Sequence, residues 1–279
     1  MKRRHVGFAV AMLVASATSA REGVIEINQT RALVGGVTAG DTPGFPVTLA
    51  AAGSYVLTGA LDVRNAPDPN TTEAIVVTAD AVRIDLNGFR IVGPVRCNGD
   101  PPATPVTCTP TGNSGVGISL ESAAGQLPQG VEIRNGTIEG FTFGGINCPT
   151  ACVIEHVVTR HHEGSGASVS SGSFVREVVA ELNSGEGISG GARTFVSDVH
   201  VSRNGGAGIR LGPGSVLSSC IASGNGGRGL TTFSLVGDDS ASAAYRDCVF
   251  VRNNGGNANP QTLGIELGEN ICGTDAVCP

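Results

Sequence analysis

The feature that most constrains the fold is a 21-residue repeat in the middle of the chain. When the chain is written in rows of this length, apolar side chains fall into the same columns in five successive rows without a gap. One column is Ile133, Ile154, Val175, Val196 and Leu217, and a second is Val157, Val178, Val199 and Cys220. A third column is glycine, at Gly145, Gly166, Gly187, Gly208 and Gly229, each followed by an apolar residue. Gapless repeats of this length are typical of solenoids, in which each unit stacks on the next.

Each row contains three short alternations of apolar and polar residues, as in FVSDVHVSRNGGAGIRL at 195–211. Period-two alternation predicts strands, and the polar corners between them are too short to hold a helix. The chain also has 42 glycines and no tryptophan, which suits narrow packing of aliphatic residues. The sequence therefore predicts an all-β, single-domain parallel β-helix with three strands per coil. Right-handed winding follows from the preference for right-handed crossovers between parallel strands.

Asparagine recurs at one corner of the repeat. Asn183, Asn204 and Asn225 hold the same place in three successive rows, and Asn253 takes that place in a later row after an addition. Stacked side-chain amides at a corner can bond to one another and to the turn backbone. We therefore expect a structural asparagine ladder, with His162 as a substitute member. The glycines that follow lead into a strand and not into a helix, which argues against a phosphate-binding loop.

The chain divides into four predicted segments. Residues 1–20 combine a basic start, a short apolar run and small residues, as a cleaved export signal does. Residues 21–60 are predicted to form an N-terminal cap, with a short helix in 26–36, and irregular first coils. Residues 61–268 form the β-helix, interrupted by a proline-rich excursion at 94–114, and 269–279 form a C-terminal cap. We therefore expect an exported protein without a membrane anchor.

Eight cysteines suit an oxidising compartment. Four sequential pairs suggest themselves, although the sequence leaves other connectivities open. The pairs are Cys97 with Cys108, Cys148 with Cys152, Cys220 with Cys248, and Cys272 with Cys278. A zinc site built on Cys148, Cys152 and His156 is the alternative, but a second cysteine module is lacking. We predict neither a metal nor another cofactor.

The corner segments NSGEGIS, NGGAGIR and NGGRGLT resemble those of right-handed parallel β-helix proteins of the pectate-lyase-like superfamily. The segment before them, from GVIEINQTRALVGG to VRIDLNGFRIVG, is similar to exported bacterial β-helix proteins that mostly lack an assigned activity. The resemblance implies the fold. It leaves function open, because this superfamily holds lyases, hydrolases, epimerases, adhesins and inert solenoids.

Enzymes of that superfamily act on acidic polysaccharides through clustered Asp with Arg or Lys, and none of their spacing motifs occurs in this chain. Acid–base groups that lie close in sequence still provide candidates for catalysis. They are Arg160, His161 and Glu163 at one corner, Asp198, His200 and Arg203 on one strand and its ends, and Asp238 and Asp239 in a seven-residue addition. Each has a structural interpretation as well, since charges alternate in sign along the columns and pair across coils.

The net charge of −6 provides no basic field for nucleic acid. The sequence therefore favours an exported carbohydrate-binding or structural solenoid without a recognisable catalytic site. A polysaccharide-active enzyme, such as a uronide lyase, hydrolase or epimerase, is the alternative. The sequence does not determine the oligomeric state.

Overall fold

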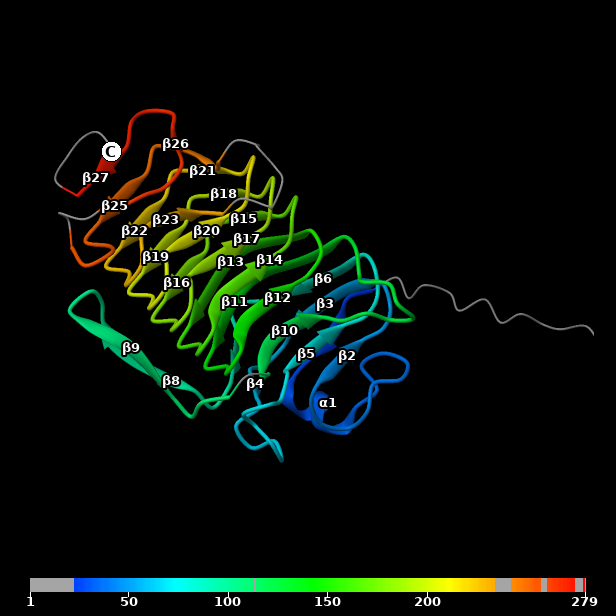
Figure 1. Ribbon diagram of the computed structural model, residues 1–279. Coiled ribbons are helices and arrows are strands. Elements are labelled where there is room, and N and C mark those ends of the chain that lie inside the picture. The colour runs from blue at the N-terminus through cyan, green and yellow to red at the C-terminus, as the bar shows by residue number, and fades with distance from the viewer. Residues whose placement is uncertain (1–22, 113, 234–241, 257–259, 274–277, 279) are drawn as a thin grey trace, which may run out of the picture.

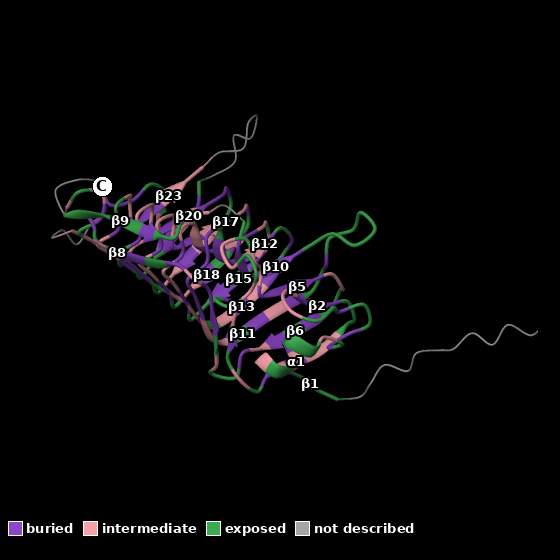
Figure 2. Cartoon of the chain, turned by 90° about the horizontal axis from the view of Figure 1, so that it is seen from below, coloured by how far each residue is buried: buried purple, intermediate pink, exposed green. Residues whose placement is uncertain are grey.

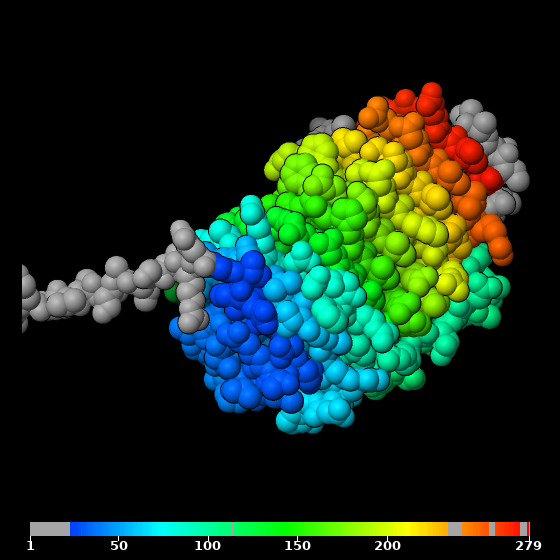
Figure 3. Space-filling model, turned by 180° about the vertical axis from the view of Figure 1, so that it is seen from behind, coloured from blue at the N-terminus to red at the C-terminus, as the bar shows by residue number. Residues whose placement is uncertain are grey.

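A computed structural model describes residues 23–112, 114–233, 242–256, 260–273 and 278 of the chain. Its successive coils stack side by side from the N-terminal to the C-terminal end (Figure 1). Seen from behind, the coils form parallel bands that run in chain order (Figure 3). The fold is a parallel β-helix, as the sequence predicts.

The coils contribute strands to three columns, and two of the columns belong to one 17-stranded sheet. The first column contains β1 (Ile25–Ile27), β3 (Gly53–Leu57), β6 (Val82–Asp85), β11 (Val131–Glu139), β13 (Cys152–Arg160), β15 (Phe174–Arg176), β18 (Phe195–Ser197), β21 (Val216–Ser218), β24 (Ala244–Arg246) and β26 (Ile265–Glu266). The second contains β4 (Leu61–Asp62), β7 (Arg90–Val92), the later halves of β11 and β13, β16 (Val179–Glu181), β19 (His200–Ser202), β22 (Ile221–Ser223), β25 (Val249–Val251) and β27 (Ile271–Cys272). The third is an eight-stranded sheet of β2 (Val47–Leu49), β5 (Ile75–Val77), β10 (Val116–Leu120), β12 (Gly144–Cys148), β14 (Ser165–Val169), β17 (Ile188–Gly190), β20 (Ile209–Leu211) and β23 (Leu230–Thr232).

The pairing register follows the repeat found in the sequence. Ile154 pairs with Val175, Val175 with Val196, and Val196 with Leu217, and all four side chains are buried. In each of β15, β18 and β21 the middle residue is buried and its two neighbours are more exposed. Figure 2 shows buried residues along the strands of successive coils. The aliphatic columns of the sequence are therefore the core, stacked at the strand spacing of about 4.8 Å.

The corners need tight backbone geometry. Between the first and second columns a single residue in the left-handed region turns the chain, for example Glu177 at φ 52° and Asp198 at φ 55°. At the asparagine corner, a Cβ on Gly187 would lie 2.6 Å from the Gly208 carbonyl oxygen and 2.8 Å from Nδ2 of Asn204. Glycine recurs in that column because adjacent coils leave no space for a side chain.

Two buried columns of polar side chains support the corners. In the first, Nδ2 of Asn183 donates to Oδ1 of Asn204, that of Asn204 to Asn225, and that of Asn225 to Asn253, at 2.8–3.0 Å. Each amide oxygen also accepts the backbone N–H of the previous member. At a different corner, the hydroxyls of Ser173, Thr194 and Ser215 bond to the backbone of neighbouring turns. The asparagine corner follows the sequence prediction, whereas the hydroxyl column was not predicted.

The excursion at 94–114 contains an antiparallel hairpin of β8 (Arg96–Asp100) and β9 (Thr104–Thr109). The hairpin lies alongside the coils near β16 and β19 (Figure 1). Its far end reaches Gly224, where an added Cβ would lie 3.2 Å from the Pro101 carbonyl oxygen. Four buried residues of the excursion form a small apolar cluster apart from the main core: Val95, Cys97, Val106 and Cys108.

The strand columns begin at Ile25 and extend to Cys272. They therefore run through 21–60, where irregular first coils were predicted beside the cap, and into 269–279, which was predicted to be a C-terminal cap. Even two- or three-residue strands keep the register. A helix, α1 (Gln29–Val34), lies where one was predicted and ends at Gly35. Oδ1 of Asn28 accepts the N–H of Arg31 at its start, and Ala32 packs into the core. Among the described residues, none of the helices has the length and apolar character that crossing a membrane requires.

Candidate functional site

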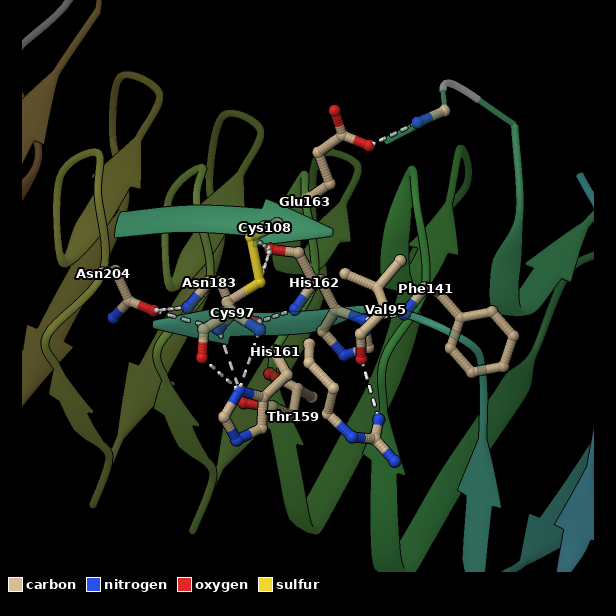
Figure 4. The surroundings of a disulfide bond; sticks show 12 residues. Val95, Cys97, Cys108, Phe141, Thr159, His161, His162, Glu163, Asn183 and Asn204 are labelled. Atoms are coloured by element: carbon tan, nitrogen blue, oxygen red, sulfur yellow. Dashed lines mark hydrogen bonds between the residues drawn. A yellow bond between two sulfur atoms is a disulfide. The ribbon is translucent and has the colours of Figure 1, made fainter. Parts of the chain in front are cut away.

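The corner at 160–163 lies beneath the hairpin, and its residues make structural contacts (Figure 4). The guanidinium of Arg160 lies 2.8 Å from a carboxylate oxygen of Glu139 and 3.7 Å from one of Glu181, on the two adjacent coils. Glu139 is buried and also binds Arg90 at 3.4 Å. Arg160 is therefore part of a charge column that runs across four coils.

The two histidines of this corner are held by backbone groups. Nδ1 of His161 lies 3.1 Å from the Cys97 carbonyl oxygen, and burial lowers the pKa of His161. His162 is fully buried in the asparagine column: Nδ1 accepts the N–H of Phe141 and Nε2 lies 3.1 Å from the Ile138 carbonyl oxygen. Burial lowers the pKa of His162 to about 3, so that it is neutral. His162 takes the ladder position that the sequence predicted.

Glu163 points away from these histidines. Its Oε2 accepts the N–H of Gly112 at 2.6 Å, which ties the end of the excursion to the coil (Figure 4). The three candidates of this corner, Arg160, His161 and Glu163, thus have three separate sets of partners. The structure does not direct them at a common point.

The other sequence candidates are also dispersed. Asp198 and Arg203 occupy two different corners, with exposed His200 on β19 between them. Arg203 binds Glu181 at 3.2 Å. Asp238 and Asp239 lie outside the described residues.

Three of the four predicted cysteine pairs are at bonding distance: Cys97 with Cys108, Cys148 with Cys152, and Cys272 with Cys278. The fourth differs from the prediction, because Cys220 and Cys248 are buried free thiols. They occupy the same position on neighbouring coils. Burial raises the pKa of the Cys220 thiol. For the zinc alternative, Cys148 and Cys152 are bonded to each other and His156 contacts Glu177.

A pair of carboxyls that the sequence analysis missed lies near the N-terminal end of the eight-stranded sheet. The Glu73 side chain lies close enough to Glu121 and Ser119 for both to influence its pKa. Burial, and then the Glu121 charge, raise the pKa of Glu73 to about 7. Glu121 and Ser119 follow the register of β10 against β5, which the intervening excursion obscures in the sequence. Glu73 is the strongest acid–base candidate in the described part of the chain.

A second missed feature is an aromatic surface on the outside of the first column. The rings of Phe174 and Phe195 stack with centroids 5.1 Å apart and planes 9° apart, yet the two residues are 50% and 47% exposed. They border a cavity of about 260 Å³. We call this surface the phenylalanine shelf, and its residues are Val153, Glu155, Phe174, Arg176, Phe195 and Ser197.

Polar groups line one side of the shelf. Arg176 forms an ion pair with Glu155 of the preceding coil, and Ser197 continues the same outward position on the next coil. The Glu155 side chain is largely buried, whereas that of Arg176 is more than half exposed. The shelf thus combines a flat apolar face with a carboxylate, a guanidinium and a hydroxyl, and the two charges compensate each other.

The shelf has a signal in the sequence. Phe174 and Phe195 hold the same place in two successive rows of the repeat, and each directly precedes an inward valine of the aliphatic column. Period-two alternation therefore directs both rings outward. An apolar aromatic column on a solvent face is unusual and is informative for that reason.

No protein-family model and no curated protein sequence matches this chain. Among solved structures, the A-module of the mannuronan C-5 epimerase AlgE4 of Azotobacter vinelandii is similar over 76% of this chain and 72% of its own, with a TM-score of 0.45 and 14% identity. Pectate lyase Pel9A is similar over 79% of this chain and 60% of its own, with a TM-score of 0.43 and 12% identity. At these values the similarities say nothing about activity, and the fold rests on the strand pairing described above.

Proposed function

We propose that the protein is an exported carbohydrate-binding β-helix and that the phenylalanine shelf binds a neutral sugar unit. The observation that carries the proposal is the coplanar, half-exposed pair of Phe174 and Phe195 at the edge of a cavity. Aromatic rings present a large rigid apolar surface, which suits the C–H face of a sugar ring. The predicted export signal and the three cysteine pairs at bonding distance support an extracytoplasmic setting.

The charges of the shelf favour a neutral ligand. Glu155 and Arg176 form an ion pair, so the shelf carries no net charge, and together they offer the acceptors and donors that hydroxyl groups need. The net charge of −6 adds a weak repulsion of polyanions. Neutral glycans therefore fit the shelf better than uronides do.

The test is retention of the protein on immobilised polysaccharides. Neutral polymers (cellulose, xylan, mannan, starch) are compared with pectate and alginate, for wild type and for the double variant Phe174→Ala/Phe195→Ala. We expect retention on at least one neutral polymer and at least a tenfold loss of affinity in the double variant.

A matched control is Phe143→Ala, which removes a ring that is 47% exposed away from the shelf. It should leave retention unchanged. Equal losses in the control and the double variant, or retention only on pectate and alginate, would contradict the proposal.

A polysaccharide-active enzyme is a second candidate, and the observation that favours it is the Glu73–Glu121 pair. A carboxyl whose pKa is near 7 is suited to exchange protons at neutral pH. Glu73 is the member of the pair whose pKa is raised, so the candidate is a single acid–base centre and not the two-carboxylate arrangement of a glycosidase.

This candidate predicts turnover of one of the same polymers, measured as unsaturated products or new reducing ends. Glu73→Gln should abolish turnover, and Phe143→Ala should not. Unchanged polymers after prolonged incubation with wild type would eliminate the enzymatic candidate and leave the binding proposal standing.

A further inference from the structure

We propose that the outer face of the eight-stranded sheet holds a second neutral-glycan site, so that one molecule bridges two glycan chains. This inference rests on the proposed function for the ligand class, but it concerns different residues on a different sheet. We call the site the serine row, and it consists of Asn147, Ser168 and Ser189.

The serine row is in register on three consecutive coils. Asn147 of β12 pairs with Ser168 of β14, which pairs with Ser189 of β17. All three point outward, since their neighbours Ile146, Ala167 and Ile188 are in the core. The row therefore runs along the axis of the β-helix, with about 4.8 Å between successive side chains.

The polar atoms of the serine row are available to a ligand. Within the described chain, no hydrogen bond involves the side chain of Asn147, Ser168 or Ser189. By contrast, the inward hydroxyls of Thr194 and Ser215 bond to backbone groups. The row thus presents free donors and acceptors, while comparable hydroxyls in the corners stabilise the fold.

An aromatic ring borders the row. Phe233 follows β23, and its side chain lines the same cavity of about 300 Å³ as the serine row does. The guanidinium carbon of Arg210, on the coil between, lies 4.4 Å from the centre of the Phe233 ring. This cation–π contact holds the ring near the row.

The chemistry of this site fits a short stretch of neutral glycan. Hydroxyl and amide groups at regular intervals match a ligand with hydroxyls along its length, and the ring adds an apolar wall. Asn147, Ser168 and Ser189 carry no charge that would select a uronate or an amino sugar. The row spans three coils, which leaves room for a short run of sugar units lying along the axis.

The two sites open on different sides of the coil. The phenylalanine shelf belongs to β15 and β18 of the 17-stranded sheet, and the serine row to β12, β14 and β17 of the eight-stranded sheet. Short turns such as 170–173 connect the sheets, and the core lies between them. A chain bound along one outer face does not extend over the other, so occupation of both sites joins two chains.

The experiment measures how many oligosaccharides each molecule binds. Wild type is titrated calorimetrically with cellohexaose, mannohexaose, xylohexaose and maltohexaose. We expect two hexamers per wild-type molecule for the sugar that binds. One hexamer should remain in Asn147→Ala/Ser168→Ala/Ser189→Ala, and one in Phe174→Ala/Phe195→Ala.

The control variant Ser202→Ala/Ser223→Ala removes hydroxyls from the second strand column and should keep two sites. A single site in wild type that only the phenylalanine variant loses would overturn the second site and leave the proposed function intact. A single site that only the row variant loses would overturn the proposed shelf and the bridge. Binding of none of the four hexamers would refute both proposals.

Discussion

Replacing His162 by asparagine should make the asparagine column insensitive to acid. His162 already bonds as its asparagine neighbours do: one nitrogen accepts the N–H of Phe141 on the preceding coil, and the other faces the Ile138 carbonyl. Asn204 uses its amide oxygen and nitrogen in the same way toward Asn183 and Ala180. The asparagine introduced by His162→Asn can therefore satisfy both backbone groups, but it cannot take up a proton.

The magnitude follows from proton linkage. Burial lowers the pKa of His162 from 6.5 to about 3 in the folded protein. Between these values the unfolded chain binds a proton that the folded chain does not, so stability is full above pH 6.5 and falls as the pH drops toward 3. Each pH unit costs about 1.4 kcal/mol, which gives about 3 kcal/mol at pH 4.5.

The assay is urea unfolding of wild type and His162→Asn at pH 7.5 and pH 4.5. At pH 7.5 the two free energies of unfolding should agree to about 1 kcal/mol, the variant losing only some packing volume. At pH 4.5 the variant should gain about 2–3 kcal/mol relative to wild type. The control is His200→Asn, whose exposed side chain should give the same small difference at both pH values. An equal pH dependence in wild type and His162→Asn would refute the reasoning.

Three further predictions concern stability. Asn204→Ala leaves the N–H of Asn183 unpaired and should lower the free energy of unfolding in urea by about 2–4 kcal/mol, with sugar binding unchanged. Equal stability with lost binding would count against a ladder role. Cys220→Val extends the valine column that includes Val199, so we expect its melting temperature to stay within a few degrees of wild type, and a large drop would show that the thiol is required. Because the pKa of Glu73 is raised in the folded protein, its contribution to the free energy of unfolding is present below pH 4.5 and is lost as the pH rises through about 7. This decline in stability is at most about 3 kcal/mol, and roughly half that after solvent screening. Glu73→Gln should remove the decline when unfolding is measured at pH 5 and pH 8.

The sequence predicted the coil because the fold repeats in the sequence itself. Ile154, Val175 and Val196 are both a column of the repeat and a ladder of paired strands. Local pairs such as Cys148 and Cys152 could also be predicted from the sequence, because a short corner brings the two residues together. Where the repeat holds, residues that are 21 positions apart in the sequence are neighbours on adjacent coils.

The candidate sites were harder to predict from the sequence, and the physical reason differs from one to the next. The influence of Glu121 on Glu73 depends on two coils separated by the 94–114 excursion, whose length the repeat does not specify. Cys220 and Cys248 lie on neighbouring coils, as expected, but they are free thiols, and sequence spacing does not specify whether neighbouring thiols are bonded. Phe174 and Phe195 recur at one position of the repeat, but the repeat does not specify how far each ring is exposed.

The central claim is that the phenylalanine shelf contacts a neutral sugar, and NMR of phenylalanine-labelled protein tests it most directly. With nine phenylalanines in the chain, the ring signals can be assigned by substitution. Titration with the four neutral hexamers should shift the ring signals of Phe174 and Phe195 in a saturable way and leave Phe143 unmoved. Ring signals of Phe174 and Phe195 that stay fixed in all four titrations would contradict the account.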